Sequence, residues 1–328
     1  MNRLPSARIA ALALLLLLLA ACGAPATSPV ASGNDGPEQA EITVGVLPIA
    51  DVAPVYLAVD RGLFADEGLT VTVELVQGGA AAIPSLVAGE LDVSYGNWVS
   101  FLLANQEGIE LRAVAAGVAA APGFTELLAL PDSGLGADPA ALAGTTIAVN
   151  TLNNIGELAI RSTLEANGVD PDDVQLVEIP FPDMGAALER GDVDVIWASE
   201  PVPTVVKRDL GAVTVADSFI GEMEEFPVAG YQATAEFLAD NPRTIAAFQR
   251  AMAAAVEIIA NEPEALTEVL LGYTNLEAEV VGELSLPSYQ TVLDAATLAR
   301  VRDYLVEFSM LEDGLDVEAL VVASTQTE

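Results

Sequence analysis

Residues Ala88–Val93 read AGELDV, and the related sequence RGDVDV occupies Arg190–Val195. The glycines of the two motifs, at positions 89 and 191, lie 102 residues apart (191 − 89). Two further features recur in the same order at nearly the same distance: Gly68-Leu69 with Gly168-Val169, and the run Ile42–Val46 with Thr146–Asn150. Three features at near-constant spacing predict that the chain contains two lobes built on the same plan.

Short β-rich runs alternate with helical stretches in both halves, which is typical of α/β sheet proteins. In the first half we expect strands at 42–47, 69–76, 91–95 and 111–118, and helices at 52–61, 80–88 and 98–106. In the second half we expect strands at 146–149, 174–179 and 193–197, and helices at 155–166, 184–190 and 202–209. The pattern changes after residue 217, where an extended segment at 226–233 precedes helices at 244–261, 264–271, 276–284 and 295–308.

This order predicts an α/β fold of two lobes joined by two hinge crossings. Lobe I would comprise residues 41–125 and 227–328, and lobe II residues 126–226. The chain would leave lobe I near Phe124–Leu130 and return near Pro227–Ala233. Two such crossings can act as the hinge of a clamshell.

The N-terminus carries an apolar run, Ile9–Leu19, which follows Arg3 and Arg8 and leads through small residues to Cys22. This is the pattern of an export signal, and the run is shorter than the ~20 residues that span a bilayer. The position of Cys22 is typical of a bacterial lipoprotein signal, in which the thiol is lipidated and the bond before it is cut. We therefore expect a signal peptide at 1–21 and, because no apolar period follows, a flexible tether at 22–40. An ordinary secretory signal with a chance cysteine is the alternative.

Acidic residues far outnumber basic ones: 48 Asp and Glu against 12 Lys and Arg give a net charge of −36. Such a surface repels a phosphate backbone, so the composition excludes nucleic acid as a partner. The chain has no histidine, one cysteine and one lysine, Lys207. These counts exclude His-based triads and Cys/His zinc sites, and we expect neither a metal nor a catalytic centre.

In open α/β sheets, ligands bind beyond the carboxyl ends of the strands. Applied to both lobes, this rule selects the following candidate ligand-binding residues: Pro48, Ile49, Asp51, Gly78, Gly79, Asn97, Trp98, Asn150, Asn153, Asn154, Phe181, Met184 and Glu200. The 102-residue repeat places Glu200 opposite Trp98 (200 − 98), so both side chains should face the cleft between the lobes.

Candidates in the first lobe each have a second interpretation. Trp98 could stack on a ligand or cap the core of its lobe. Gly78 and Gly79 could form only a tight turn, or offer free backbone N–H groups at the start of a helix. Asp51 could bind a ligand, although capping the following helix is the simpler role.

Candidates in the second lobe are open in the same way. One amide of the group Asn150, Asn153 and Asn154 should cap the next helix, which leaves the others for a ligand. Phe181 and Met184 could form cleft walls or ordinary packing. Glu200 could accept a hydrogen bond from a ligand or merely begin a helix.

Several of these residues belong to a family pattern. The pattern comprises Ala53–Ala58, Arg61–Phe64, Glu67–Leu69, Gly78-Gly79, Gly89–Asp92, Leu142–Val149 and Glu200-Pro201. It resembles the solute-binding proteins of nitrate, sulfonate and taurine ABC importers, a group that also includes binders of the thiamine-pyrimidine precursor. The resemblance covers residues 42 to about 205 well and the C-terminal helices only loosely.

This resemblance implies a periplasmic-binding-protein type II fold that captures a small polar solute between two lobes. The expected partners are the solute, a permease and an ATPase, and the expected protein is an exported monomer anchored to the membrane by lipid. The alternative is an enzyme, because pyrimidine-synthesis relatives share the fold. Those relatives depend on histidine and a cofactor-bearing lysine, whereas histidine is absent here and Lys207 stands alone, so we expect no cofactor.

The chemistry of the ligand stays open between two classes. The candidate loops contain no Arg or Lys, so a sulfonate or nitrate would depend on helix N-termini and amides. The strongly negative protein disfavours an anion. An amine-bearing or pyrimidine-like ligand would suit Trp98 for stacking and Glu200 as an acceptor.

Overall fold

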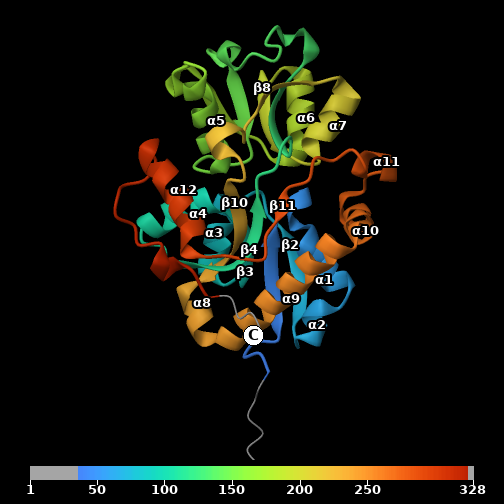
Figure 1. Ribbon diagram of the computed structural model, residues 1–328, viewed down its shortest axis with the longest axis vertical. Coiled ribbons are helices and arrows are strands. Elements are labelled where there is room, and N and C mark those ends of the chain that lie inside the picture. The colour runs from blue at the N-terminus through green and yellow to red at the C-terminus, as the bar shows by residue number, and fades with distance from the viewer. Residues whose placement is uncertain (1–35, 324–328) are drawn as a thin grey trace, which may run out of the picture. The chain divides into compact units, whose positions relative to one another are not determined.

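The computed structural model describes residues 36–323, which contain two β-sheets (Figure 1). The first sheet has the strand order β11-β4-β10-β3-β1-β2, and we call the part of the chain that carries it lobe I. Its strands are β1 (Glu41–Val46), β2 (Thr70–Leu75), β3 (Val93–Asn97), β4 (Leu111–Ala119), β10 (Pro227–Thr234) and β11 (Ser288–Tyr289). The second sheet has the order β7-β6-β8-β5-β9 and defines lobe II. Its strands are β5 (Thr125–Ala129), β6 (Thr146–Val149), β7 (Gln175–Glu178), β8 (Val195–Ser199) and β9 (Val213–Asp217).

The two sheets share one topology. In lobe I, β1 pairs in parallel with β2 and β3, and β10 runs antiparallel between β3 and β4. In lobe II, β6 pairs in parallel with β7 and β8, and β5 runs antiparallel between β8 and β9. The predicted two-lobed α/β fold is therefore confirmed.

The repeated sequence motif has the same role in each lobe. Gly89 and Gly191 have φ values of 72° and 71°, in the left-handed region, and end the helices that precede them. Three residues later, Asp92 and Asp194 each accept a 2.8 Å hydrogen bond through Oδ2, from the backbone N–H of Thr43 and of Thr146 respectively. The motif thus stops a helix and ties the next strand to the first strand of the same sheet.

Helices cover both faces of each sheet (Figure 1). The helices of lobe I are α1 (Ala53–Asp60), α2 (Leu63–Asp66), α3 (Gly79–Ala88), α4 (Trp98–Gln106), α8 (Ala235–Asp240), α9 (Pro242–Asn261), α10 (Pro263–Thr274), α11 (Ala278–Val281) and α12 (Ala295–Glu307). Those of lobe II are α5 (Ile155–Ala166), α6 (Phe181–Arg190) and α7 (Val202–Leu210). In lobe I, α1, α2, α9 and α10 pack together on one side, and α3, α4 and α12 lie on the other.

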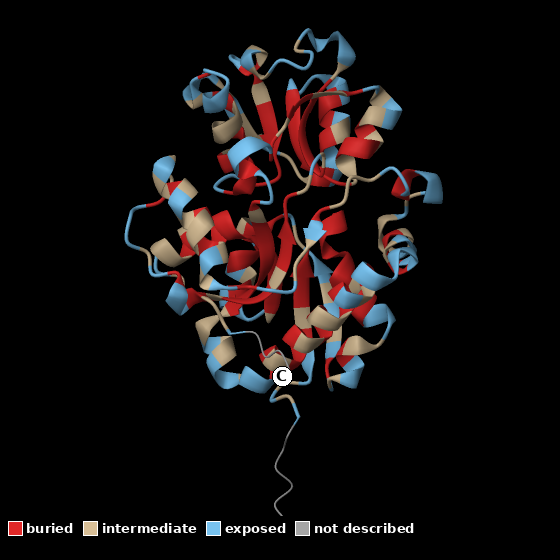
Figure 2. Ribbon diagram, in the orientation of Figure 1, coloured by how far each residue is buried: buried red, intermediate tan, exposed pale blue. Residues whose placement is uncertain are grey.

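The central strands form the cores of the lobes. Every residue of β3, β5 and β8 is buried, as Figure 2 shows by the red strands at the centre of each sheet. Strands covered on both faces by helices are mostly apolar, although these three also bury the polar residues Ser94, Asn97, Thr125, Glu126 and Ser199. Among residues 36–323, no helix is both long and apolar enough to cross a membrane.

The hinge crossings lie next to the segments expected for them. Phe124–Leu130 and Pro227–Ala233 were expected to be crossings, but they supply β5 and β10, which are interior strands of the sheets. The connecting backbone is instead at 120–124 and 218–226. The expectation was wrong because each apolar segment continues from the crossing into the ladder of a sheet, where its backbone groups are paired.

Aromatic rings hold the two crossings together. The backbone N–H of Ala120 donates to the carbonyl of Phe226 over 2.8 Å. The ring of Phe219 stacks on Phe124 and on Phe226, with centroid distances of 5.8 and 6.4 Å. The crossings therefore form one packed unit.

Several smaller elements differ from expectation. The strands β9 and β11 and the short helix α2 were not predicted, and only Ala278–Val281 is helical within the expected helix 276–284. Residues 36–40 were expected to belong to the tether, yet Glu38 Oε2 accepts hydrogen bonds from the backbone N–H groups of Arg243 and Thr244 at the start of α9. The signal peptide, Cys22 and the rest of the tether lie outside the described residues.

Gly230, in the middle of β10, has no room for a side chain. A β-carbon there would lie 2.6 Å from the carbonyl oxygen of Ala115 and against the ring of Trp98. Overpacking of this kind typically costs about 1–3 kcal/mol, so Gly230→Ala should lower the midpoint of urea unfolding. Gly272→Ala, in α10 with no atom within 4 Å of the new methyl group, is the matched control and should leave the midpoint unchanged or raise it slightly. Equal midpoints for both variants would contradict the packing described.

Candidate functional site

A cavity lies where the carboxyl ends of strands from both lobes meet. It contains about 370 Å³ not filled by protein atoms, part of it open to solvent. Lobe I contributes Leu47, Ile49, Asp51, Gly79, Tyr95, Gly96, Asn97, Val228 and Ala229. Lobe II contributes Asn150, Asn154, Ile155, Phe181, Trp197 and Ser199. The site depends on the approach of the two lobes, because neither lobe encloses it alone.

Equivalent strand ends face each other across this cavity. Tyr95 and Asn97 end β3, and Trp197 and Ser199 occupy the same positions, 102 residues later, at the end of β8. Residues two apart on a strand point to the same face, so each pair presents both side chains together. Asn97 also caps α4, because its Oδ1 accepts a 2.9 Å hydrogen bond from the backbone N–H of Ser100.

Asp51 is a buried carboxylate at the wall of the cavity. It lies in a single 3-10 turn, Ala50–Val52, and is 3% exposed. Oδ2 accepts a 2.9 Å hydrogen bond from the Tyr95 hydroxyl, whereas Oδ1 has no hydrogen-bond partner among the described residues. Burial raises the pKa of Asp51 to about 7. The expected capping role was wrong, because α1 begins after Val52 without a side-chain cap.

Tyrosines from distant elements fix the turn that carries Asp51. The hydroxyl of Tyr273, in α10, donates to the carbonyl of Ile49 over 2.9 Å, and that of Tyr289, in β11, donates to the carbonyl of Ala50 over 2.8 Å. With the Tyr95 bond, three hydroxyls therefore hold three consecutive residues. This arrangement positions the Asp51 carboxylate without neutralising its charge.

A chain of amides lines the opposite wall. Asn154 caps α5, since its Oδ1 accepts from the backbone N–H of Glu157, as expected for one member of this group. Its Nδ2 donates to Asn150 Oδ1 over 2.7 Å, and Asn150 Nδ2 donates to the carbonyl of Gln77 in lobe I over 3.3 Å. The amide chain thus runs from the start of α5 to the other lobe.

The lobes touch at the edges of the cavity. The backbone N–H of Ala50 donates to the carbonyl of Glu200 over 2.9 Å, and Ser100 Oγ donates to the carbonyl of Asn153 over 2.8 Å. Gly78 lies so close to lobe II that a β-carbon would be 2.8 Å from Asn150 Nδ2. The structure therefore shows the lobes in contact around the site.

Glu200 does not line the cavity, contrary to expectation. Its Oε1 accepts from Thr204 Oγ1 over 2.8 Å and from the backbone N–H of Ser285 over 3.1 Å, and its Oε2 accepts from the backbone N–H of Thr204 over 3.2 Å. Burial raises the pKa of this carboxyl. Its polar atoms are used to start α7 and to connect lobe II with the segment before β11, so the side chain turns away from the cavity.

Trp98 also lies away from the cavity, which corrects the expectation that its ring faces the cleft. It is 2% exposed, contacts Phe101 edge to face at a centroid distance of 5.6 Å and packs against Gly230. As the first residue of α4 it follows the end of β3, and α4 packs on β10. The 102-residue repeat therefore leads to the cavity at Tyr95 and Trp197 rather than at Trp98.

The candidate residues from the sequence therefore divide into two groups. Those that line the cavity are Ile49, Asp51, Gly79, Asn97, Asn150, Asn154 and Phe181. Those that do not are Pro48, Gly78, Trp98, Asn153, Met184 and Glu200. Met184 is fully buried in lobe II, and the side chain of Asn153 belongs to an outer groove beside α5.

Sequence reasoning missed eight residues of the cavity wall: Leu47, Tyr95, Gly96, Ile155, Trp197, Ser199, Val228 and Ala229. Tyr95, Trp197 and Ser199 could have been found by applying the repeat to the last residues of the strands rather than to the loops after them. Val228 and Ala229 come from β10, whose counterpart β5 lies about 102 residues earlier in lobe II, and no candidate was placed on either strand because both were interpreted as hinge crossings.

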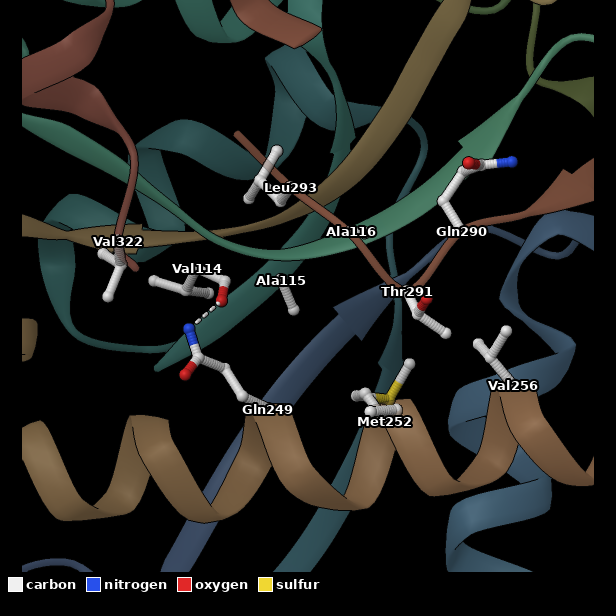
Figure 3. Close-up of a pocket in the computed structure, with 11 residues that line it drawn as sticks. Val114, Ala115, Ala116, Gln249, Met252, Val256, Gln290, Thr291, Leu293 and Val322 are labelled. Carbon is white, nitrogen blue, oxygen red and sulfur yellow. Dashed lines mark hydrogen bonds between the residues drawn. The ribbon is translucent and has the colours of Figure 1, made fainter. Parts of the chain in front are cut away.

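A second cavity lies within lobe I (Figure 3). Gln249, Met252 and Val256 project from α9 toward β4, and Gln249 Nε2 donates to the carbonyl of Val114 over 2.7 Å. Its other wall is the segment around Leu293. This cavity involves no strand end and no residue of lobe II, so it is separate from the site between the lobes.

The site can bind a small polar molecule through a carboxylate, amides and aromatic rings. The described residues that line it include no Lys or Arg. Over residues 36–323, no group of three or more His, Cys, Asp or Glu side chains could hold a metal ion.

Comparison with known proteins identifies relatives over most of the chain. A family described as "NMT1/THI5 like" matches residues 49–266. The formylaminopyrimidine-binding protein of Halalkalibacterium halodurans is 25% identical over 271 residues, which are 81% of this chain and 78% of that protein. The 4-amino-5-hydroxymethyl-2-methylpyrimidine phosphate synthase of Aspergillus parasiticus is 26% identical over 227 residues, 66% of this chain and 65% of the synthase.

Solved structures confirm the fold. The alkanesulfonate-binding protein SsuA of Xanthomonas axonopodis pv. citri, bound to MOPS, has a TM-score of 0.75 and 17% sequence identity. The match covers 87% of this chain and 98% of that protein. At this identity the similarity concerns the periplasmic-binding-protein fold alone.

The buried carboxyl gives a prediction with a defined sign. Because the pKa of Asp51 is raised from 3.8 to about 7, the folded protein binds a proton that the unfolded chain releases near pH 4. Its contribution to wild-type stability is full below about pH 4 and is lost as the pH rises to about 7. Asp51→Asn removes this dependence. Its free energy of unfolding, relative to wild type, should therefore increase by on the order of 2–3 kcal/mol from pH 5 to pH 8.

Urea melts of both proteins at several pH values measure this difference. The other carboxyl groups titrate in both proteins and cancel. A difference that stays constant across the range would show that Asp51 does not hold a proton near neutral pH.

Proposed function

Because the chain belongs to the NMT1/THI5-like family, we propose that it is the extracytoplasmic solute-binding component of an ABC importer. It captures a small polar solute between its lobes and delivers it to a permease driven by an ATPase. The observation that carries this proposal is the cavity itself, which is shared by the strand ends of both lobes and holds an unpartnered buried oxygen of Asp51.

The proposed ligand contacts are the residues that line this cavity. From the sequence candidates these are Ile49, Asp51, Gly79, Asn97, Asn150, Asn154 and Phe181, to which the structure adds Tyr95, Trp197 and Ser199. Gly78, Asn153 and Glu200 act at the contact between the lobes instead. The names of two of these relatives give a formylaminopyrimidine and an alkanesulfonate as ligands.

An enzyme is the second candidate, and the relative named as a pyrimidine phosphate synthase is the observation in its favour. Residues of this chain support binding without reaction. The sequence contains no histidine. Its single lysine, Lys207, forms an ion pair with Glu126 and is not among the residues that line the cavity.

Export and anchoring complete the proposal. Residues 1–21 direct export, and the thiol of Cys22 carries the lipid that holds a monomer on the outer side of a membrane. The tether, expected at 22–40, would end before Glu38, which is bound to the start of α9. The lipid would keep the protein on the membrane that holds its permease.

A thermal-shift screen tests the binding function. The protein without residues 1–35 is scanned against sulfonates, nitrate, polyamines and pyrimidines, and a ligand at 100 times its Kd should stabilise the fold by about 2.7 kcal/mol. Small-angle scattering then compares the free protein with the protein saturated by the ligand that the screen identifies. The radius of gyration of the bound protein should be no larger than that of the free protein, because the ligand holds the lobes together. The proposal fails if no class shifts the melting temperature.

Gly78→Ala tests whether the contact between the lobes is needed. The new methyl group would meet Asn150 and Thr151 of lobe II at 2.8 Å. It should weaken binding of the screened ligand by about tenfold, equivalent to ~1.4 kcal/mol. Gly272→Ala is again the control and should bind as wild type does. Unchanged affinity in Gly78→Ala would show that the lobes need not approach this closely.

Cys22→Ser tests the anchor. With no thiol to carry lipid, the full-length variant should appear in the soluble fraction or keep its signal peptide uncleaved. Membrane fractionation with immunoblotting measures both outcomes. If the variant is processed and fractionates with membranes as wild type does, the lipoprotein proposal is wrong.

A further inference from the structure

We infer that the ligand presents a protonated or N–H-bearing nitrogen to Oδ1 of Asp51, the unpartnered buried oxygen at the wall of the interlobe cavity. The inference rests on the proposed function and specifies the chemical class of the solute. It assigns Asp51 as the residue that selects nitrogen donors over anions.

The first step in the argument is hydrogen bonding. Oδ1 of Asp51 has no partner among the described residues, although the side chain is 3% exposed and lines the cavity. Buried polar atoms are nearly always paired, and a carboxylate oxygen can only accept. When Asp51 is ionised, its missing partner must therefore be an N–H or O–H donor, and the cavity is the space from which it can come.

The second step is the rigidity of the turn. Tyr95, Tyr273 and Tyr289 hold Asp51 and the two residues before it through hydrogen bonds of 2.8–2.9 Å. These bonds use Oδ2 and backbone carbonyls and leave Oδ1 open. A carboxylate fixed in this way cannot easily turn to another partner, so the ligand meets an acceptor already in place.

The third step is charge. The titratable groups that face Asp51 are tyrosines: Tyr95 from β3, Tyr231 from β10, Tyr273 from α10 and Tyr289 from β11. Burial raises the pKa of each of them, so they stay neutral near pH 7. With no Lys or Arg among the described residues of the cavity, an anionic ligand would find no counter-ion, only the N-termini of α3, α5 and α6, and it would meet one negative charge where Asp51 is ionised. A cation would neutralise that charge.

The pH dependence follows from the same geometry. Because burial raises the pKa of Asp51 to about 7, the carboxyl is ionised at pH 8 and largely protonated at pH 6. A cation binds the ionised form, so its affinity should fall about tenfold from pH 8 to pH 6. An anion held by the protonated carboxyl would show the opposite sign.

Three ring compounds of similar size separate the ligand classes: benzylammonium, benzyl alcohol and benzenesulfonate. The rings suit Phe181 and Trp197, which line the lobe II wall. In calorimetric titrations of the folded protein at pH 8, benzylammonium should bind most tightly. Asp51→Asn should weaken its binding at least tenfold and abolish the difference between pH 8 and pH 6.

Glu126→Gln is the matched control. Glu126 is a buried acid outside the cavity, paired with Lys207, so this variant removes the same charge without touching the ligand. It should keep the affinity and pH profile of wild type. Circular dichroism checks that Asp51→Asn is folded, and the wild-type pH profile tests the inference without any variant.

Two results would overturn the inference. One is benzenesulfonate binding more tightly than benzylammonium at pH 8. The other concerns benzylammonium, which would contradict the inference in two ways. It could fail to bind at about 10 mM, a concentration that detects a Kd in the millimolar range, or it could bind the wild type and Asp51→Asn equally well. In either case a sulfonate or nitrate that binds in the wider screen would leave the proposed function intact. Failure of every class in that screen would instead remove the proposed function.

Discussion

Each sheet of this protein depends on an antiparallel strand that connects directly to a hinge crossing. β10 enters lobe I between β3 and β4, and β5 enters lobe II between β8 and β9. Both strands are interior, so their backbone groups are paired on two sides and cannot bend without breaking ladder hydrogen bonds. The backbone that connects the two sheets is therefore limited to 120–124 and 218–226, where Phe124, Phe219 and Phe226 pack together.

Much of the fold could be predicted from the sequence, because the repeat is carried by residues with a defined structural task. Gly89 and Gly191 end helices, and Asp92 and Asp194 anchor the following strands. The crossings were predicted a few residues too late in the chain. In sequence, an apolar segment that forms a strand of a sheet cannot be distinguished from an apolar segment that only connects the two lobes. β9 and β11 were missed since their places are set by partners far away in the chain.

The site was predictable to the level of the loop and not of the side chain. The strand-end rule located the right region, and half of the candidates line the cavity. Trp98 and Glu200 were misplaced by one residue in the repeat, and at a strand-to-helix junction one residue decides between the cleft and the core. The tyrosines that hold the Asp51 turn come from α10 and β11, and no local pattern could connect them with position 51.

The intrinsic fluorescence of the protein comes largely from its two tryptophans, which lie in different surroundings. Trp98 is enclosed in lobe I against Gly230 and Phe101. Trp197 forms part of the cavity wall, and its indole N–H donates to Ser218 Oγ in the second crossing over 3.1 Å. The emission of Trp197 would therefore report on the cavity wall and the second crossing, while that of Trp98 would report on unfolding of lobe I. Replacing Trp98 by phenylalanine would leave a protein whose intrinsic fluorescence follows the cavity alone, a reagent-free sensor for its solute.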